Sequence, residues 1–184
     1  MIRCAKLSLA ALWCAFLLAC SGALPRYRTL PDWVQRVYVP IFENETAEPG
    51  LEELGARFAI EEFLIDGRLE VANKADADLI VRVNLQEFLE RPVGFSNDDF
   101  GETIEMTAIG EVQLLEPSNP DPKTPFANLG SVQGRVTYYT DKRSSFVTLD
   151  SDAKEQLMRN FGRAVVVRVI TGFSDKNLEQ YNAS

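Results

Sequence analysis

Few side chains in this sequence could do chemistry. The 184 residues include no His and three Cys, so the commonest general base and metal ligand is missing. Asp76 and Asp78 could act as paired acids, as could Asp98 and Asp99. Both pairs lie in expected turns, however, where Asp is favoured because it bonds its own backbone. We therefore expect no catalytic residue, no metal site and no enzymatic activity.

Cys20 is the residue whose setting suggests a chemical modification. It follows two basic residues and an uncharged apolar run of 12 residues, the layout of a secretory signal peptide. The run is too short for a membrane span, which needs about 20 apolar residues. The tetrapeptide Leu17–Cys20 resembles the lipobox of bacterial lipoproteins, in which the Cys is acylated and becomes the mature N-terminus. The alternative is an ordinary signal peptide with a chance Cys.

The lipoprotein interpretation sets the expected organisation. Residues 1–19 form the signal peptide, residues 20–32 a lipidated tether, residues 33–172 one domain and residues 173–184 a flexible tail. The covalent lipid on Cys20 is the membrane contact, and we expect no other cofactor. Ser21, and not Asp, follows Cys20, and similarity to such lipoproteins then favours the periplasmic side of the outer membrane.

The charge of the chain restricts its possible partners, and its cysteine content restricts what can stabilise the fold. Without the signal peptide the chain keeps 17 basic and 27 acidic side chains, a net charge of −10, which argues against a nucleic-acid partner. The predicted domain also keeps no thiol, because Cys4 and Cys14 belong to the signal peptide. An exported domain without disulfides must be held by its core.

The hydrophobic pattern predicts one α+β domain of order β-α-β-β-β-α. A strand begins at Val37, and Pro40 places it at an edge or marks a bulge. A helix follows, with an apolar stripe of Leu51, Leu54, Phe58 and Ile65, and we expect it to end at Gly67. Three long strands alternate strictly over about residues 79–86, 102–115 and 129–140. A last helix starts near Asp152 and stops at Gly172, although residues 165–170 would also suit a strand.

Two amphipathic helices on one face of a four-stranded, mostly antiparallel sheet give a two-layer sandwich. The other face of the sheet carries polar side chains, and it is either a plain solvated face or a surface suited to the polar lumen of an outer-membrane barrel. The first helix carries Ile60, Phe63 and Leu64 away from its stripe, which indicates either a wider core contact or a second covered side.

The chain resembles the LPS-assembly lipoprotein LptE family. The similarity is carried by the lipobox at Cys20, by VYVPIFENETAEPGLEELGARFAIEEFLIDGRLEV from Val37 and by ADADLIVRVNLQEF from Ala75. The resemblance implies a non-enzymatic outer-membrane lipoprotein that plugs and helps to assemble an LptD-type barrel and takes part in lipopolysaccharide transport to the outer leaflet. Basic side chains in loops are implied contacts for the glycolipid, here Arg91, Lys142 and Arg143.

A second interpretation belongs to another class. A strand that ends in Pro-x-Phe-x-Asn-x-Thr, then a helix, then a strand led by Ala-Asp, also resembles the α/β modules of lipoproteins that activate envelope enzymes or build secretion channels. The polar sheet face would then bind and regulate a periplasmic enzyme or a secretion channel. Three consecutive long strands and a closing helix favour the LptE-like interpretation.

Overall fold

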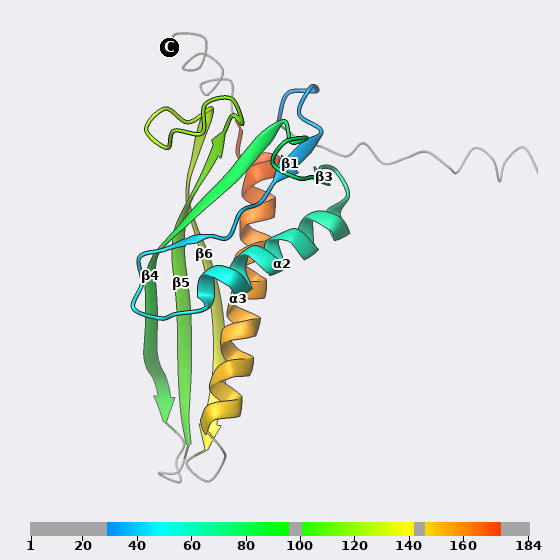
Figure 1. The fold of residues 1–184 in the computed structure, drawn as a ribbon. Coiled ribbons are helices and arrows are strands. Elements are labelled where there is room, and N and C mark those ends of the chain that lie inside the picture. The colour runs from blue at the N-terminus through cyan, green and yellow to red at the C-terminus, as the bar shows by residue number, and fades with distance from the viewer. Residues whose placement is uncertain (1–28, 96–100, 142–145, 174–184) are drawn as a thin grey trace, which may run out of the picture.

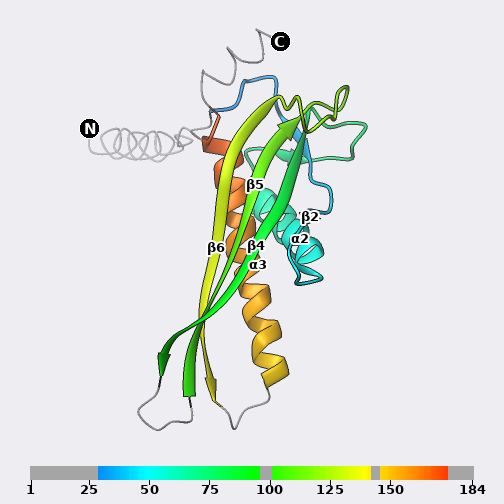
Figure 2. The same cartoon turned by 90° about the vertical axis from the view of Figure 1, so that its left-hand side faces the viewer.

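The computed structural model of the protein describes residues 29–95, 101–141 and 146–173. Within these ranges the chain folds into one sheet with two helices on the same side of it (Figure 2). The strands are β1 (Arg36–Tyr38), β2 (Glu43–Asn44), β3 (Glu70–Val71), β4 (Leu79–Phe95), β5 (Gly101–Leu115) and β6 (Ala127–Asp141), and the helices are α2 (Leu51–Asp66) and α3 (Phe146–Thr171). The predicted α+β class and two-layer arrangement are confirmed.

The three long strands form an antiparallel unit, as predicted, with β5 between β4 and β6. Each has 15 to 17 residues, and at about 3.3 Å per residue such a strand is roughly 50 Å long. The domain is correspondingly tall and narrow (Figure 1). We call the end where β4 and β6 finish the distal end.

The sequence predicted one first strand in a four-stranded sheet, and this is corrected by the structure, which has two short strands, β1 and β2, in its place. β1 and β2 both pair with β4 in parallel, and Pro40 lies in the gap between them. Proline has no N–H to donate to a ladder, so the strand is interrupted there. β3 pairs in parallel with β1, and the described residues thus form a mixed sheet of six strands in the order β3-β1-β4-β5-β6, with β2 beside β4.

Helix α2 ends as its sequence predicts, but its buried face is different. Gly67 takes the left-handed conformation with φ 67° and donates its N–H to Phe63 O, a common helix C-cap. Leu51 and Phe58 are buried as expected, whereas Ile65 is 76% exposed, so its predicted place in the stripe is wrong. Phe63, which the sequence placed on the opposite side, is fully buried in the same core as Leu51 and Phe58.

Helix α3 is longer than predicted and begins at Phe146, six residues before the expected start. The segment that would also suit a strand is helical through Thr171. Val165, Val169 and Ile170 are buried there in the core, so tertiary packing overrides the preference of β-branched residues for strands.

Glycines let α3 lie close to the sheet and to α2. A Cβ on Gly134 would lie 2.7 Å from Phe161 Cβ, and one on Gly110 would lie 3.0 Å from the Phe161 ring. The Phe161 side chain therefore fills the space above two glycines on neighbouring strands. It also meets Phe42 edge-on, with ring centroids 6.2 Å apart.

The two ends of the described chain meet at what we call the proximal end. Thr29 donates its N–H to Ile170 O at 2.9 Å, and Leu30 is buried. Phe173 is buried as well, and its ring stacks on Phe126 at a centroid distance of 5.4 Å. Residues assigned to the tether and to the tail thus pack on the domain at Thr29–Leu30 and at Phe173.

Candidate functional site

The surface of interest is the polar sheet face, which is the side of the sheet away from the helices. A bulge in β4 between Leu85 and Glu87 shapes it. Before the bulge the odd-numbered residues of β4 face the helices, and after it they face outward with Thr107 and Glu105. The face is built from β4 (Arg82, Asn84, Glu87, Leu89, Arg91), β5 (Glu105, Thr107, Ile109, Glu111, Gln113), β6 (Ser131, Gln133, Arg135, Thr137) and β2 with its following turn (Glu43, Glu45).

In the half of this face toward the proximal end, the polar side chains are hydrogen-bonded to one another. Arg82 pairs with Glu43 through two hydrogen bonds, one of them from Nε at 2.7 Å, and donates to Gln113 Oε1 at 2.9 Å. Asn84 donates to Glu45 Oε1 at 2.8 Å. Asn84 and Gln113 are each only 8% exposed, so these polar side chains are largely covered by their partners.

The distal half of the face carries a cluster of three charges. Glu105 lies between two arginines, 3.3 Å from Arg91 and 3.4 Å from Arg135. The carboxylate is mostly covered, whereas the side chains of Arg91 and Arg135 are 61% and 53% exposed. The cluster has one excess positive charge and presents two guanidinium groups to solvent, which suits an anionic group such as a phosphate.

One of the predicted contact residues lies in this cluster. Arg91 is on β4, four residues from the end of the strand, and the expected loop position is therefore wrong. Cys20, Lys142 and Arg143 lie outside the described residues. In the sequence Lys142 and Arg143 directly follow Asp141, which pairs with Gly101 at the distal end. Sequence reasoning did not find Arg135 as a partner of Arg91, because only the strand register joins both to Glu105.

Asp78, one of the acids weighed as a catalytic pair, is bonded to the backbone and side chain of the segment at β1. The Asp78 carboxylate accepts the backbone N–H groups of Gln35 and Arg36 at 2.9 and 2.7 Å and pairs with the Arg36 guanidinium at 3.1 Å. Burial raises the pKa of Asp78, but these bonds outweigh burial and hold the pKa below its ordinary value. Asp78 therefore anchors β1, and Asp98 and Asp99 lie outside the described residues.

Asn44 organises the turn that leads from β2 to α2. Asn44 Nδ2 donates to Glu48 O and to Glu52 Oε2 at 2.9 and 2.7 Å. Its Oδ1 accepts the N–H and the hydroxyl of Thr46 at 3.0 and 2.7 Å. The side chain thus holds the turn between β2 and α2 at both of its polar atoms.

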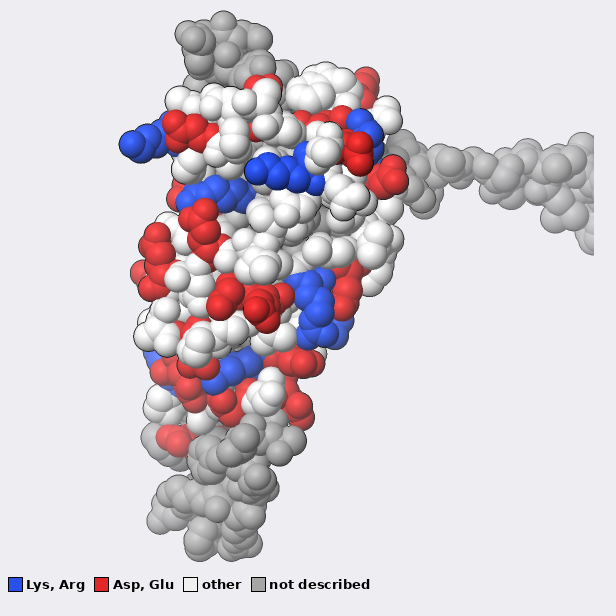
Figure 3. Space-filling model, in the orientation of Figure 1, with Lys and Arg blue, Asp and Glu red and all other residues white. Residues whose placement is uncertain are grey.

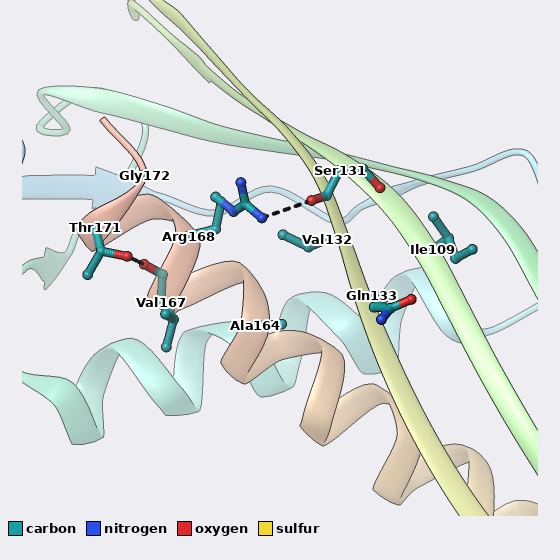
Figure 4. Close-up of a pocket in the computed structure, with 9 residues that line it drawn as sticks. All are labelled: Ile109, Ser131, Val132, Gln133, Ala164, Val167, Arg168, Thr171 and Gly172. Atoms are coloured by element: carbon teal, nitrogen blue, oxygen red, sulfur yellow. Dashed lines mark hydrogen bonds between the residues drawn. The ribbon is translucent and has the colours of Figure 1, made fainter. Parts of the chain in front are cut away.

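A second surface feature is a groove of about 700 Å³ between the edge strand β6 and the C-terminal half of α3 (Figure 4). Arg168 reaches across it and donates to the carbonyl groups of Leu129 and Ser131, both at 3.2 Å. Two turns earlier in α3, Asn160 donates its side-chain N–H to Arg135 O at 2.8 Å. These bonds satisfy carbonyl groups on the free edge of β6, which otherwise could pair with another strand. Val167, half exposed, lines the groove.

The helix side of the domain is charged but balanced. Arg159 and Arg163 of α3 pair with Glu61 and Glu62 of α2 at 3.4 and 3.1 Å. In the space-filling view acidic and basic groups alternate, and no large area carries one sign (Figure 3). In the described part of the chain no helix is long and apolar enough to cross a membrane, and no group of three or more Cys, Asp or Glu side chains could hold a metal ion.

No family model matches the chain, and no curated protein matches it either. Solved structures of similar shape include the hypothetical protein CT253 from Chlamydia trachomatis (9% identity, 73% of this chain and 95% of that chain, TM-score 0.49). Others are a minor lipoprotein from Acinetobacter baumannii (10%, 74% and 90%, 0.44) and the uncharacterized lipoprotein B from Nitrosomonas europaea (20%, 88% and 97%, 0.42). Two of these three bacterial proteins are lipoproteins. At such identities and TM-scores the similarity carries no functional information.

Proposed function

We propose that this protein is a non-enzymatic outer-membrane lipoprotein, acylated at Cys20, that plugs and helps to assemble an LptD-type barrel and takes part in lipopolysaccharide transport to the outer leaflet. The observation that carries the proposal is the shape of the domain together with its surface. Strands of roughly 50 Å match the 40–45 Å thickness of a bilayer with its headgroups. Both layers present paired charges on their outer sides, which suits the polar lumen of an outer-membrane barrel.

The proposal is tested first by isolating the partner. The tagged, lipidated protein is purified from detergent-solubilised envelopes, and the expected companion is a large outer-membrane barrel in near one-to-one amount. A periplasmic enzyme in its place, or no companion, would contradict the plug role.

Crosslinking then separates a plug from a module that docks through one face. A photo-crosslinking residue is placed at Thr137 on the polar sheet face or at Val167 on the helix side. Both positions are exposed, and a plug surrounded by the lumen wall should link to the same barrel from both. Links from one position only would refute the enclosed arrangement.

The proposed lipopolysaccharide contact lies at the distal end, where the Arg91–Glu105–Arg135 cluster leaves two guanidinium groups exposed and the chain continues from Asp141 into Lys142 and Arg143. Reversing both charges with Lys142→Glu and Arg143→Glu should weaken lipopolysaccharide binding in vitro, because phosphate groups would then meet carboxylates. Lys74→Glu with Lys123→Glu is the control, since it makes the same charge change at two exposed lysines in other turns. Equal binding by both double variants would remove Lys142 and Arg143 from the account.

The groove beside β6 favours a second candidate function. An envelope lipoprotein that binds and regulates a periplasmic enzyme or secretion channel would use such a groove, where Arg168 and the half-exposed Val167 offer a cation beside an apolar contact. Crosslinks to a soluble protein from either position, with none to a barrel, would favour this function over the plug.

A further inference from the structure

The point at which the chain enters the domain is fixed. The Thr29 N–H and hydroxyl both donate to Ile170 O, at 2.9 and 3.2 Å, and the Thr29 hydroxyl accepts the Phe173 N–H at 3.1 Å. These bonds join the start of the described chain to the C-terminal end of α3. Thr29, the first described residue, therefore lies at the proximal end of the domain.

The distance between that point and Cys20 is short. Thr29 follows Cys20 by nine residues, and even a fully extended chain of this length spans at most about 30 Å. If Cys20 carries the acyl chains, the proximal end must stay within that distance of the bilayer surface. The distal end is farther away by about the length of the strands.

Trp33 is exposed at this same end. Its edge contacts the Phe126 ring at a centroid distance of 5.6 Å, and Phe126 in turn stacks on Phe173. One side of the indole is thus supported by aromatic rings, while 53% of the residue is open to solvent. Tryptophan is enriched at membrane–water interfaces, because its ring is apolar and its N–H can donate to a headgroup.

The charge of the preceding sequence agrees with a membrane contact. Between Cys20 and Asp32 the chain carries Arg26 and Arg28 with Tyr27 between them and no carboxylate. The mature chain as a whole has a net charge of −10, so this short basic and aromatic segment is an exception in its composition. Arginines next to a membrane anchor are attracted by the anionic headgroups of phospholipids.

We propose that the proximal end of the domain rests on the phospholipid surface, with the Trp33 indole at the lipid–water interface. The lipid on Cys20, part of the proposed function, holds the protein there, and Trp33 sets which end of the domain faces the membrane. The partner surface is a bilayer with anionic phospholipid headgroups. In the barrel of the proposed function this end would lie at the periplasmic opening, and the Arg91–Glu105–Arg135 cluster at the other end of the strands would lie inside the lumen.

Trp33 itself reports the contact. The sequence has two tryptophans, and the other, Trp13, belongs to the predicted signal peptide. The lipidated mature protein is reconstituted in vesicles of phosphatidylethanolamine and phosphatidylglycerol, with or without brominated acyl chains. We expect Trp33 emission to shift to shorter wavelength on reconstitution and to be quenched by the brominated lipids.

A matched reporter at the other end gives the control. Tyr139 lies on β6, 12 residues after the start of this strand, about 40 Å away at 3.3 Å per residue. It is 54% exposed, as open as Trp33. In the variant Tyr139→Cys, which keeps Trp33, a polarity-sensitive fluorophore on the new thiol should keep its long-wavelength emission and escape quenching. Equal quenching of both reporters would mean that the domain lies flat, and it would overturn the end-on contact.

Flotation of the vesicles distinguishes a failure of the Trp33 contact from a failure of the proposed lipidation. A protein that floats with vesicles while Trp33 stays unquenched is anchored without the contact, which overturns this inference and leaves lipidation standing. A protein that lacks acyl chains and does not float would refute the lipoprotein assignment, and the inference would fall with it.

Discussion

Replacing Gly134 by Ala is the most direct test of how α3 lies on the sheet. The new Cβ would lie 2.7, 2.8 and 2.9 Å from Phe161 Cβ, N and Cα, whereas ordinary contacts begin at 3.4 Å. Two of these atoms belong to the backbone of a helix of 26 residues, so a side-chain rotation cannot relieve the contact. The helix would have to move away from β6 by roughly 0.5–0.7 Å, loosening a core that is otherwise closely packed.

Overpacking of this kind costs about 1–3 kcal/mol. We expect Gly134→Ala to lower the free energy of unfolding by about 2 kcal/mol, which corresponds to a fall in Tm of about 4–8 °C for a domain of this size. The measurement is urea unfolding of the mature domain, followed by circular dichroism and by Trp33 fluorescence.

Gly94→Ala is the matched control for this variant. Gly94 is also a strand glycine, but a Cβ there would meet Thr103 at 3.6 Å, an ordinary contact. Its stability should stay within about 0.5 kcal/mol of the unchanged protein. If Gly134→Ala unfolds at the same urea concentration as Gly94→Ala, with the same slope, α3 does not lie against Gly134 as described.

Two further variants test the polar contacts. Asn44→Ala should lower the free energy of unfolding by about 1–3 kcal/mol, because the partners of its amide lose bonds in a part-buried turn; urea unfolding that matches the unchanged protein would refute its role. Burial and the charge of Glu90 raise the pKa of Tyr138 to about 12 from 10.0, so the folded state keeps this proton after the unfolded state has lost it. The stability that Tyr138 contributes is therefore present below pH 10 and is lost as pH rises toward 12. Tyr138→Phe should show a smaller loss of stability over that range, and an unchanged pH profile would count against the shift.

The elements with strong periodicity could be predicted from sequence. Helix α2 has its glycine C-cap where expected, and β4 to β6 follow the alternation of apolar residues. These signals are local, since a left-handed cap and a period of two are properties of the chain itself. Which side of α2 is buried depends on tertiary packing and not on the local sequence, and Ile65 was misplaced for that reason.

The short elements could not be predicted. β2 and β3 have two residues each, too few for any periodicity, and they exist because β1 and β4 offer free ladder positions. The early start of α3 has a similar origin. The sequence offers an N-cap at Asp152, yet the helix continues back to Phe146, alongside the distal half of β6 (Figure 1).

The placement of Arg91 shows why register matters for the candidate site. An uninterrupted alternation from Leu79 through Leu85 would turn every later odd-numbered residue of β4 toward the helices, and Arg91 would face the core. The bulge after Leu85 adds one residue to β4, so the alternation is reversed beyond it. Arg91 then faces outward beside Glu105, and the core receives Phe88 in its place. The positive cluster at the distal end therefore depends on one extra residue in β4, Gln86, which a strict alternation continued from Leu85 does not include.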